Sequence, residues 1–158
     1  MNDSRVAIIK HDNVSYPGKG FFRPDYAYPE CPFPNEISSD KNQVYEMVRE
    51  SFIKLKLDYV NYNKKEWNPL GKWIKPGDKV LLKPNLVLDI NYNLGEGVEC
   101  IYTHPSVTAA VIDYVLVALA GDGEIVVADA PVQQCRFEKL VEESGYGKLI
   151  QWYQWKMR

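Results

Sequence analysis

Three short apolar runs in this chain each lead into polar residues, and this pattern restricts the fold more than any other feature. The runs are residues 5–10, 80–82 and 125–128. The polar residues that follow them are His11 and Asp12, then Lys83 and Asn85, and then Asp129. Apolar runs without polar alternation are typical of strands buried on both faces of a parallel sheet. We therefore expect three buried strands with polar chemistry at their carboxyl ends.

Helical patterns occupy the sequence around these runs. Residues 38–40 offer capping side chains, and apolar residues then recur every three or four positions as far as Tyr59. A second pattern begins at Pro105, a residue suited to the first helical turn, and ends at Gly121. A last helix is expected over about residues 136–143.

The order strand, helix, strand, helix, strand, helix predicts an α/β fold. We expect three layers: a mostly parallel sheet with right-handed crossover helices on both faces. A chain of 158 residues is the size of one domain, so residues 1–158 are expected to form a single α/β domain. An irregular excursion over residues 14–35, rich in proline and aromatic residues, interrupts it. This loop either has a function, as a lid or partner-binding surface, or covers a flank of the sheet.

Composition excludes several classes of protein. The formal net charge of -2 gives no electrostatic reason to expect a nucleic acid or an anionic membrane as a partner. No apolar run approaches the roughly 20 residues that span a bilayer, and the start of the chain lacks the apolar core of a signal peptide. We therefore expect a cytoplasmic protein.

The cysteines and histidines argue against a resident metal or cofactor. The three cysteines, Cys31, Cys100 and Cys135, are widely spaced and odd in number, which indicates free thiols rather than a disulfide framework. The chain has no CxxC motif and only two histidines, His11 and His104. Neither a zinc ribbon nor an iron-sulfur cluster can be built from this spacing, so no metal site and no cofactor are predicted.

The polar strand ends predict a binding site. In parallel α/β sheets the binding crevice lies beyond the carboxyl ends of the strands, and the helix that follows Thr103 and His104 should open on the same side. The predicted ligand-binding residues are Lys83, Asn85, Thr103, His104, His11 and Asp12. Ammonium, amide and helix N-terminal donors suit a carboxylate- or phosphate-bearing small molecule.

Three of these residues could also take part in a reaction. His104 can exchange protons near neutral pH, Lys83 can hold an anionic group, and Asp129 can position either residue or act as a base. Each also has a structural alternative: Lys83 can reach out of the sheet into water, His104 can be a helix cap, and Asp129 can cap a turn. Their common placement favours a site, and whether it only binds or also catalyses stays open.

Three stretches in order, VLLKPNLV, THPSVTAAVIDYVLVAL and IVVADAPVQQCRFEKLVEESGYGKL, resemble the family called domain of unknown function 362. The resemblance runs from about Arg5 to Gly147 and implies that the chain is the N-terminal part of a longer family architecture. Many members carry iron-sulfur cysteines, which this chain lacks, so a cluster is expected only in longer members or a partner. The iron-sulfur members imply redox chemistry. The family is also distantly similar to the nickel-dependent lactate racemase group, which implies racemase-like chemistry with Lys83, Asn85 and His104 facing a small hydroxy acid.

A non-catalytic interaction module is the alternative. The aromatic excursion and the apolar C-terminal tail, residues 151–158, could join a protein partner or a second copy of the chain. In that case the tail is expected to be a strand that pairs with another chain, because an exposed aromatic strand is otherwise prone to aggregate.

Overall fold

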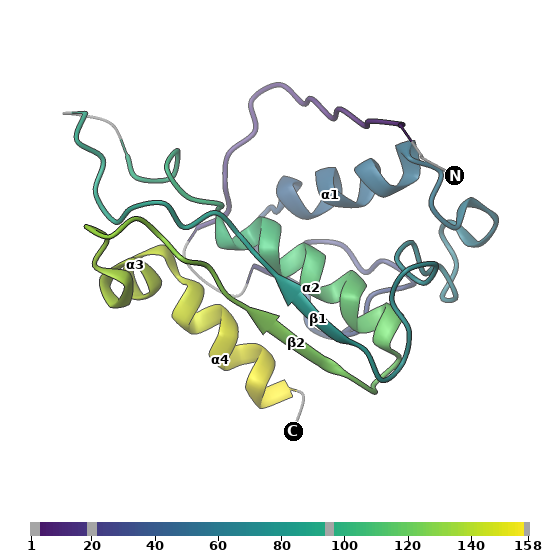
Figure 1. Ribbon diagram of the computed structural model, residues 1–158. Coiled ribbons are helices and arrows are strands. Elements are labelled where there is room, and N and C mark those ends of the chain that lie inside the picture. Colours follow the sequence, from purple (N-terminus) through teal and green to yellow (C-terminus); the bar gives the residue numbers. More distant parts are fainter. Residues whose placement is uncertain (1–3, 19–21, 94–96, 157–158) are drawn as a thin grey trace.

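The described residues of the computed structural model, 4–18, 22–93 and 97–156, contain two strands, four α-helices and one 3-10 helix (Figure 1). In chain order the elements are α1 (Gln43–Lys54), η1 (Tyr59–Asn61), β1 (Lys79–Leu82), α2 (Pro105–Leu119), β2 (Glu124–Val127), α3 (Phe137–Ser144) and α4 (Tyr146–Lys156). The fold thus mixes helices with a small parallel sheet, as predicted.

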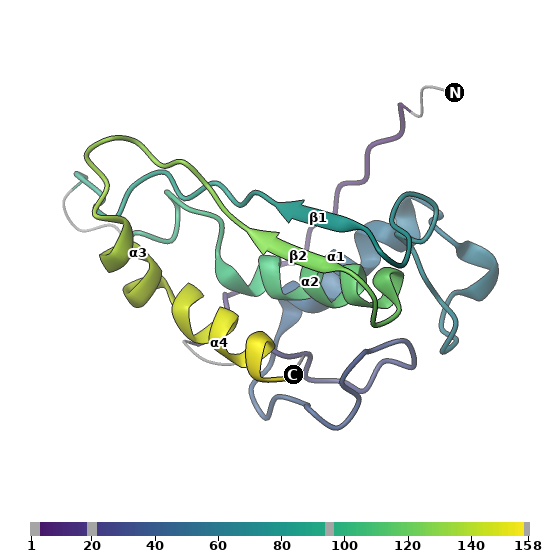
Figure 2. The same cartoon turned by 60° about the horizontal axis from the view of Figure 1, so that its bottom comes forward.

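Strands β1 and β2 form a parallel pair, and α2 is the crossover between them. They pair from Lys79 opposite Glu124 to Leu82 opposite Val127. Because side chains alternate between the faces of a strand, Leu82, Ile125 and Val127 all pack into the core on one side. Figures 1 and 2 show α2 and α4 on the same side of the sheet. Two of the three predicted strands are therefore confirmed.

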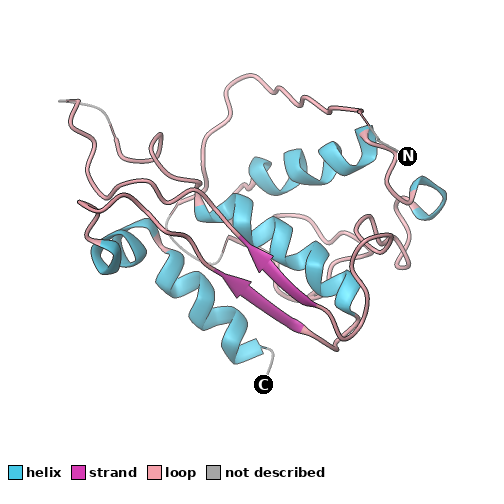
Figure 3. Ribbon diagram, viewed as in Figure 1, coloured by secondary structure: helices cyan, strands magenta, loops and turns pink. Residues whose placement is uncertain are grey.

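The prediction of a strand over residues 5–10 is wrong. This segment runs past α1 as a loop (Figure 3). Val6 and Ile8 are 83% and 80% exposed, whereas Ala7 and Ile9 line a hollow against α1. A strand needs a neighbour that pairs with its backbone groups, and among the described residues no strand pairs with this segment. The apolar pattern of this segment indicated a strand but did not indicate whether a second strand would pair with it.

The three-layer arrangement is not confirmed, because within the described ranges the helices lie on one face of the sheet. On the other face Leu81 is 64% and Val126 40% exposed. Lys79 and Glu124 form an exposed ion pair across the same face, with 2.8 Å between Nζ and Oε2. Both strands bury only alternate residues, so they have the pattern of a sheet covered on one side.

Residues 151–156 of the C-terminal tail belong to helix α4 instead of the expected pairing strand, and residues 157 and 158 lie outside the described residues. The buried residues of α4 are Tyr146, Leu149, Trp152 and Tyr153, a helical spacing that places one face in the core. Gly145 ends α3 in the left-handed conformation, with φ of 95°, and lets the chain turn into α4. Helix α1 also ends earlier than predicted, at Lys54, because the chain leaves the helical conformation at Lys56, whose φ is 55°.

The aromatic excursion is part of the core. Phe22 is buried, and the ring of Phe33 meets that of Trp152 edge-on, with 5.1 Å between the centroids. Arg23 follows Phe22 in sequence and is also buried. Its guanidinium carbon lies 4.8 Å from the ring centroid of Trp152. The excursion therefore packs on α4 rather than on a flank of the sheet.

A buried carboxylate, Asp113 of α2, joins this loop to three helices. Its Oδ1 lies 2.7 Å from Nη1 of Arg23 and accepts a hydrogen bond of 2.6 Å from the hydroxyl of Tyr153 on α4. Its Oδ2 accepts a hydrogen bond of 2.8 Å from the hydroxyl of Tyr45 on α1. Asp113 is only 1% exposed, so its charge is balanced by Arg23 and its hydrogen bonds rather than by water.

We predict that Asp113→Asn destabilises the fold by about 3–5 kcal/mol, because it leaves the buried guanidinium of Arg23 without a counter-charge. The free energy of unfolding in urea measures this loss. Asp122→Asn, in the exposed turn before β2, is the matched control and should change the stability by no more than about 0.5 kcal/mol. Equal stabilities of the two variants would contradict a dominant role for the buried pair.

Candidate functional site

Lys83, Asn85 and Asp129 meet just beyond the carboxyl ends of β1 and β2, as the sequence predicts. The strands run into this region together, since the backbone N–H of Ala128 donates to the carbonyl of Leu82 over 3.1 Å. Nζ of Lys83 lies 2.6 Å from Oδ1 of Asp129 and donates to Oδ1 of Asn85 over 3.2 Å. The lysine thus bridges the ends of both strands.

Asp129 is the buried residue of this cluster. Its side chain is 4% exposed, and its Oδ2 accepts a hydrogen bond of 2.6 Å from the backbone N–H of Leu86. The hydrogen bond from Lys83, and then that from Leu86, lower the pKa of Asp129 below its ordinary value. The carboxylate is therefore ionised at neutral pH and suits a positioning role better than that of a general base.

Thr103 is brought to the same place by a short backbone pairing. Its N–H donates to the carbonyl of Asn85 over 2.8 Å, and its Oγ1 accepts from the N–H of Asn85 over 3.1 Å. An isolated antiparallel bridge pairs the next residues, Leu86 and Tyr102. Thr103 thus fixes the backbone of Asn85 through these two hydrogen bonds.

His104 caps helix α2 from within an aromatic pocket. Its Nδ1 accepts from the backbone N–H of Ser106 over 3.3 Å and lies 2.8 Å from the Ser106 hydroxyl. The ring stacks on Tyr16, with centroids 4.1 Å apart, and meets the edge of Phe22. Burial lowers the pKa of His104, so the ring is neutral at neutral pH.

Tyr16 and Phe22 are therefore residues of this region that the sequence reasoning missed. Both come from the aromatic excursion, and Tyr16 is still 49% exposed. The richness of the excursion in aromatic residues was the available signal, but nothing in sequence spacing indicates which ring would reach His104. The contact depends on how the loop crosses the amino end of α2.

The structure does not place His11 and Asp12 with Lys83. Nε2 of His11 instead lies 2.9 Å from Oε2 of Glu50 on α1, and Asp12 is exposed. Their predicted place depended on a strand over residues 5–10, and that strand does not form. No contact with Lys83 is found for either residue among those that the structure describes.

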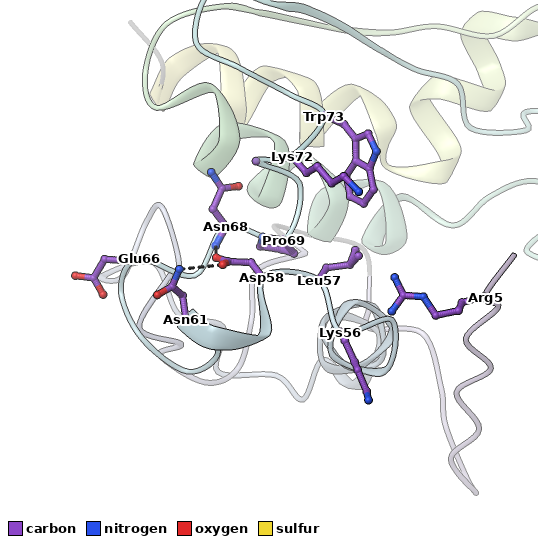
Figure 4. A pocket seen from close by; sticks show the side chains of 11 residues that line it. Arg5, Lys56, Leu57, Asp58, Asn61, Glu66, Asn68, Pro69, Lys72 and Trp73 are labelled. Atoms are coloured by element: carbon purple, nitrogen blue, oxygen red, sulfur yellow. Dashed lines mark hydrogen bonds between the residues drawn. The ribbon is translucent and has the colours of Figure 1, made fainter. Parts of the chain in front are cut away.

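Surface hollows lie elsewhere on the described chain. One of about 450 Å³ lies beyond the carboxyl end of α1 (Figure 4). It is lined by acidic and basic residues alike, and its Asp58 already accepts hydrogen bonds from Nδ2 of Asn61 and the N–H of Asn68, over 2.9 and 2.8 Å. This hollow therefore has no clear charge preference, and it does not include Lys83, Asn85, Thr103 or Asp129, which we call the strand-end cluster.

Within the residues that the structure describes, no group of three or more histidine, cysteine, aspartate or glutamate side chains could hold a metal ion. No helix there is long and apolar enough to span a membrane.

We predict that Asp129→Asn removes an acid-sensitive part of the stability. The pKa of Asp129 is lower in the folded than in the unfolded chain, so its contribution is present above about pH 4 and is lost as the pH falls through the folded value. At neutral pH the variant should be about 1–3 kcal/mol less stable, and the difference should shrink on acidification. Urea unfolding at stepped pH measures it, with Asp12→Asn as the exposed control; a difference independent of pH would contradict the assignment.

Part of the chain is similar to known proteins. Residues 80–157 match the family described as Domain of unknown function (DUF362). The chain is also 42% identical over 82 residues to "Thylakoid-associated protein sll1697" of Synechocystis sp.; the match covers 52% of this chain and 23% of that protein. The chain thus spans about a quarter of that relative's length.

No solved structure matches the chain at a significant level. The similarity to the nickel-dependent lactate racemase group is not shown by these matches, and the expected cytoplasmic location stays a prediction. The matched residues contain the strand-end cluster of Lys83, Asn85, Thr103 and Asp129 together with the helix cap His104. Over residues 80–157 the chain is therefore similar to the DUF362 family.

Proposed function

We propose that the strand-end cluster binds a small molecule that carries a carboxylate or phosphate group. The observation that supports this most is the state of Lys83: its ammonium is held by Asp129 and Asn85, yet its side chain is 60% exposed. An ammonium group has three donors, and one of them is directed at Oδ1 of Asn85, while Asp129 supplies a close counter-charge. Because the side chain is exposed, a further donor is available to an anion that approaches from solvent.

Asn85 would complete the contact with the ligand. Because its Oδ1 accepts from Lys83, the Nδ2 atom with its two donors is left for a second oxygen of the same anion. The pairing with Thr103 holds the Asn85 backbone, so the donors are positioned before the ligand arrives. Two neighbouring donor groups, one charged, suit the two oxygens of a carboxylate.

Catalysis at this edge has less support than binding. His104 is 7% exposed between Tyr16 and Phe22, and its Nδ1 already faces Ser106. Asp129 is ionised but nearly enclosed, so its part is to hold Lys83. A racemase-like or redox reaction would need groups beyond these, and an iron-sulfur cluster would come from a partner or a longer relative.

The alternative, an interaction module, depended on exposed aromatic residues in the excursion and the tail, and several of these residues are buried. In the aromatic excursion Phe22 is buried, and in the C-terminal tail Trp152 and Tyr153 are buried in the core. Tyr26 and Trp155 remain exposed, at 63% and 66%. Because the tail is a packed helix, pairing with another chain through a tail strand is not part of the proposal.

We predict that Lys83→Ala weakens the binding of small anions about ten- to a hundredfold, as expected for the loss of one charge-assisted hydrogen bond. Lactate, other short hydroxy acids and inorganic phosphate are the probes, and isothermal titration gives the affinities. Lys79→Ala is the matched control, since Lys79 lies at the other end of β1 and also pairs with a carboxylate. Equal affinities of the two variants, or no binding of any probe by the native chain, would overturn the proposal.

A further inference from the structure

Residues 4–18, which we call the N-terminal segment, run past α1 to the amino end of α2 without forming a helix or a strand (Figure 3). Side-chain contacts hold this segment to the rest of the chain. Nη1 of Arg5 donates to a backbone carbonyl just after α1 over 2.5 Å, and Nε2 of His11 lies 2.9 Å from a carboxylate oxygen of α1. Farther along, the ring of Tyr16 stacks on that of His104, with 4.1 Å between the centroids. The stack on His104 thus fastens the end of the segment at α2.

His104 caps α2 only while its Nδ1 carries no proton. Nδ1 accepts the backbone N–H of Ser106 over 3.3 Å, one of the N–H groups that have no partner within the first turn of a helix. A proton on Nδ1 turns this acceptor into a donor. The hydroxyl of Ser106, 2.8 Å away, can accept from the new donor, but the backbone N–H cannot. The positive ring would also lie at the positive end of the helix dipole, so protonation works against the cap in two ways.

The surroundings of the ring give little support to a positive charge. His104 is 7% exposed, and Phe22 and Ser106, which contact the ring besides Tyr16, carry no charge. Burial lowers the pKa of His104 and outweighs Glu99, whose charge raises it. The folded chain therefore binds fewer protons here than the unfolded chain. The stability of this arrangement is complete above about pH 6.5, the ordinary value for histidine, and falls as the pH drops from there toward the lower folded value.

The end of the N-terminal segment also covers apolar residues of the two helices. Val14 and Tyr16 line a hollow of about 530 Å³ together with Ala7 and Ile9. The helices contribute apolar side chains to the same hollow, from Val44, Met47, Val48 and Val107. If Tyr16 left His104, these side chains would be more open to water, and an apolar surface would be exposed.

We propose that His104 is a pH-sensitive switch that fastens the N-terminal segment. At neutral pH the uncharged ring caps α2 and holds Tyr16. In acid the ring takes up a proton from water on Nδ1 and leaves its place between Tyr16 and Phe22. Tyr16 then separates from α2 and the apolar hollow opens. Lys83 and Asn85 take no part in this change, so the switch does not depend on the proposed anion binding.

NMR spectroscopy of the whole chain, titrated from about pH 8 to about pH 5, tests the coupling on which the switch depends. The backbone N–H signal of Ser106 and the ring signals of Tyr16 should move together with the ring signals of His104, at one midpoint below about pH 6.5. A His104 ring that takes up a proton while the Tyr16 signals stay unchanged would overturn the proposal. So would a ring that stays uncharged throughout the titration.

A dye that fluoresces on exposed apolar surface, anilinonaphthalene sulfonate, measures the opening of the hollow. Its signal with the native chain should rise between about pH 7.5 and about pH 5. His104→Asn should lose this rise, because asparagine caps a helix without titrating in this range. His11→Asn removes the other histidine of the chain and should keep the rise.

Tyr16→Ala provides a check that leaves the capping residue in place. At about pH 7.5 this variant should already give the higher dye signal that the native chain reaches only in acid. Circular dichroism shows whether each variant keeps its helices. An equal rise in native chain and His104→Asn, or a rise that is lost in His11→Asn, would contradict the assignment of the switch to His104.

Discussion

The buried ion pair between Arg23 and Asp113 is the interaction on which the arrangement of this chain depends. Asp113 lies in the middle of α2, and its carboxylate is met by Tyr45 of α1 and Tyr153 of α4 as well as by the loop arginine. One carboxylate therefore orients three helices and an otherwise irregular loop. Removing its charge would leave Arg23 uncompensated, and this energetic link makes the four segments one packing unit.

Buried carboxylates also hold the chain in place where the strands end. Asp129 receives Lys83 and the N–H of Leu86, and Asp89 receives the backbone N–H and the guanidinium of Arg136. The irregular segments that follow β1 and β2 are thus held by charged hydrogen bonds where sheet pairing has stopped. Polar residues at the strand ends have a structural role here, and the exposed ammonium of Lys83 is the basis of the anion-binding site that we propose.

Several features of the fold could be read from the sequence because they depend on local patterns. The helix start at Pro105, the strand-forming residues before Lys83 and Asp129, and the parallel pairing all follow from periodicity and from the rule for crossovers. The first helix was expected to be capped by residues 38–40, but α1 begins at Gln43, and its cap is Asn42. The meeting of Lys83, Asn85 and Asp129 follows as well, since residues at the carboxyl ends of neighbouring parallel strands must lie at one edge. The run at residues 5–10 shows the limit: its apolar pattern is that of a strand, but a pattern cannot provide a pairing neighbour.

The sequence by itself determined which segments can be helices or strands and which polar residues follow the strands, because these properties depend on neighbours within a few positions. Only the tertiary structure decided the partners: His104 with Tyr16 rather than with Lys83, His11 with Glu50, and Arg23 with Asp113, 90 positions away. It also decided that the tail is a helix, since Trp152 and Tyr153 gain their burial from a loop and a helix far away in the sequence. Such contacts depend on how the whole chain closes, and local propensity contains no information about that closure.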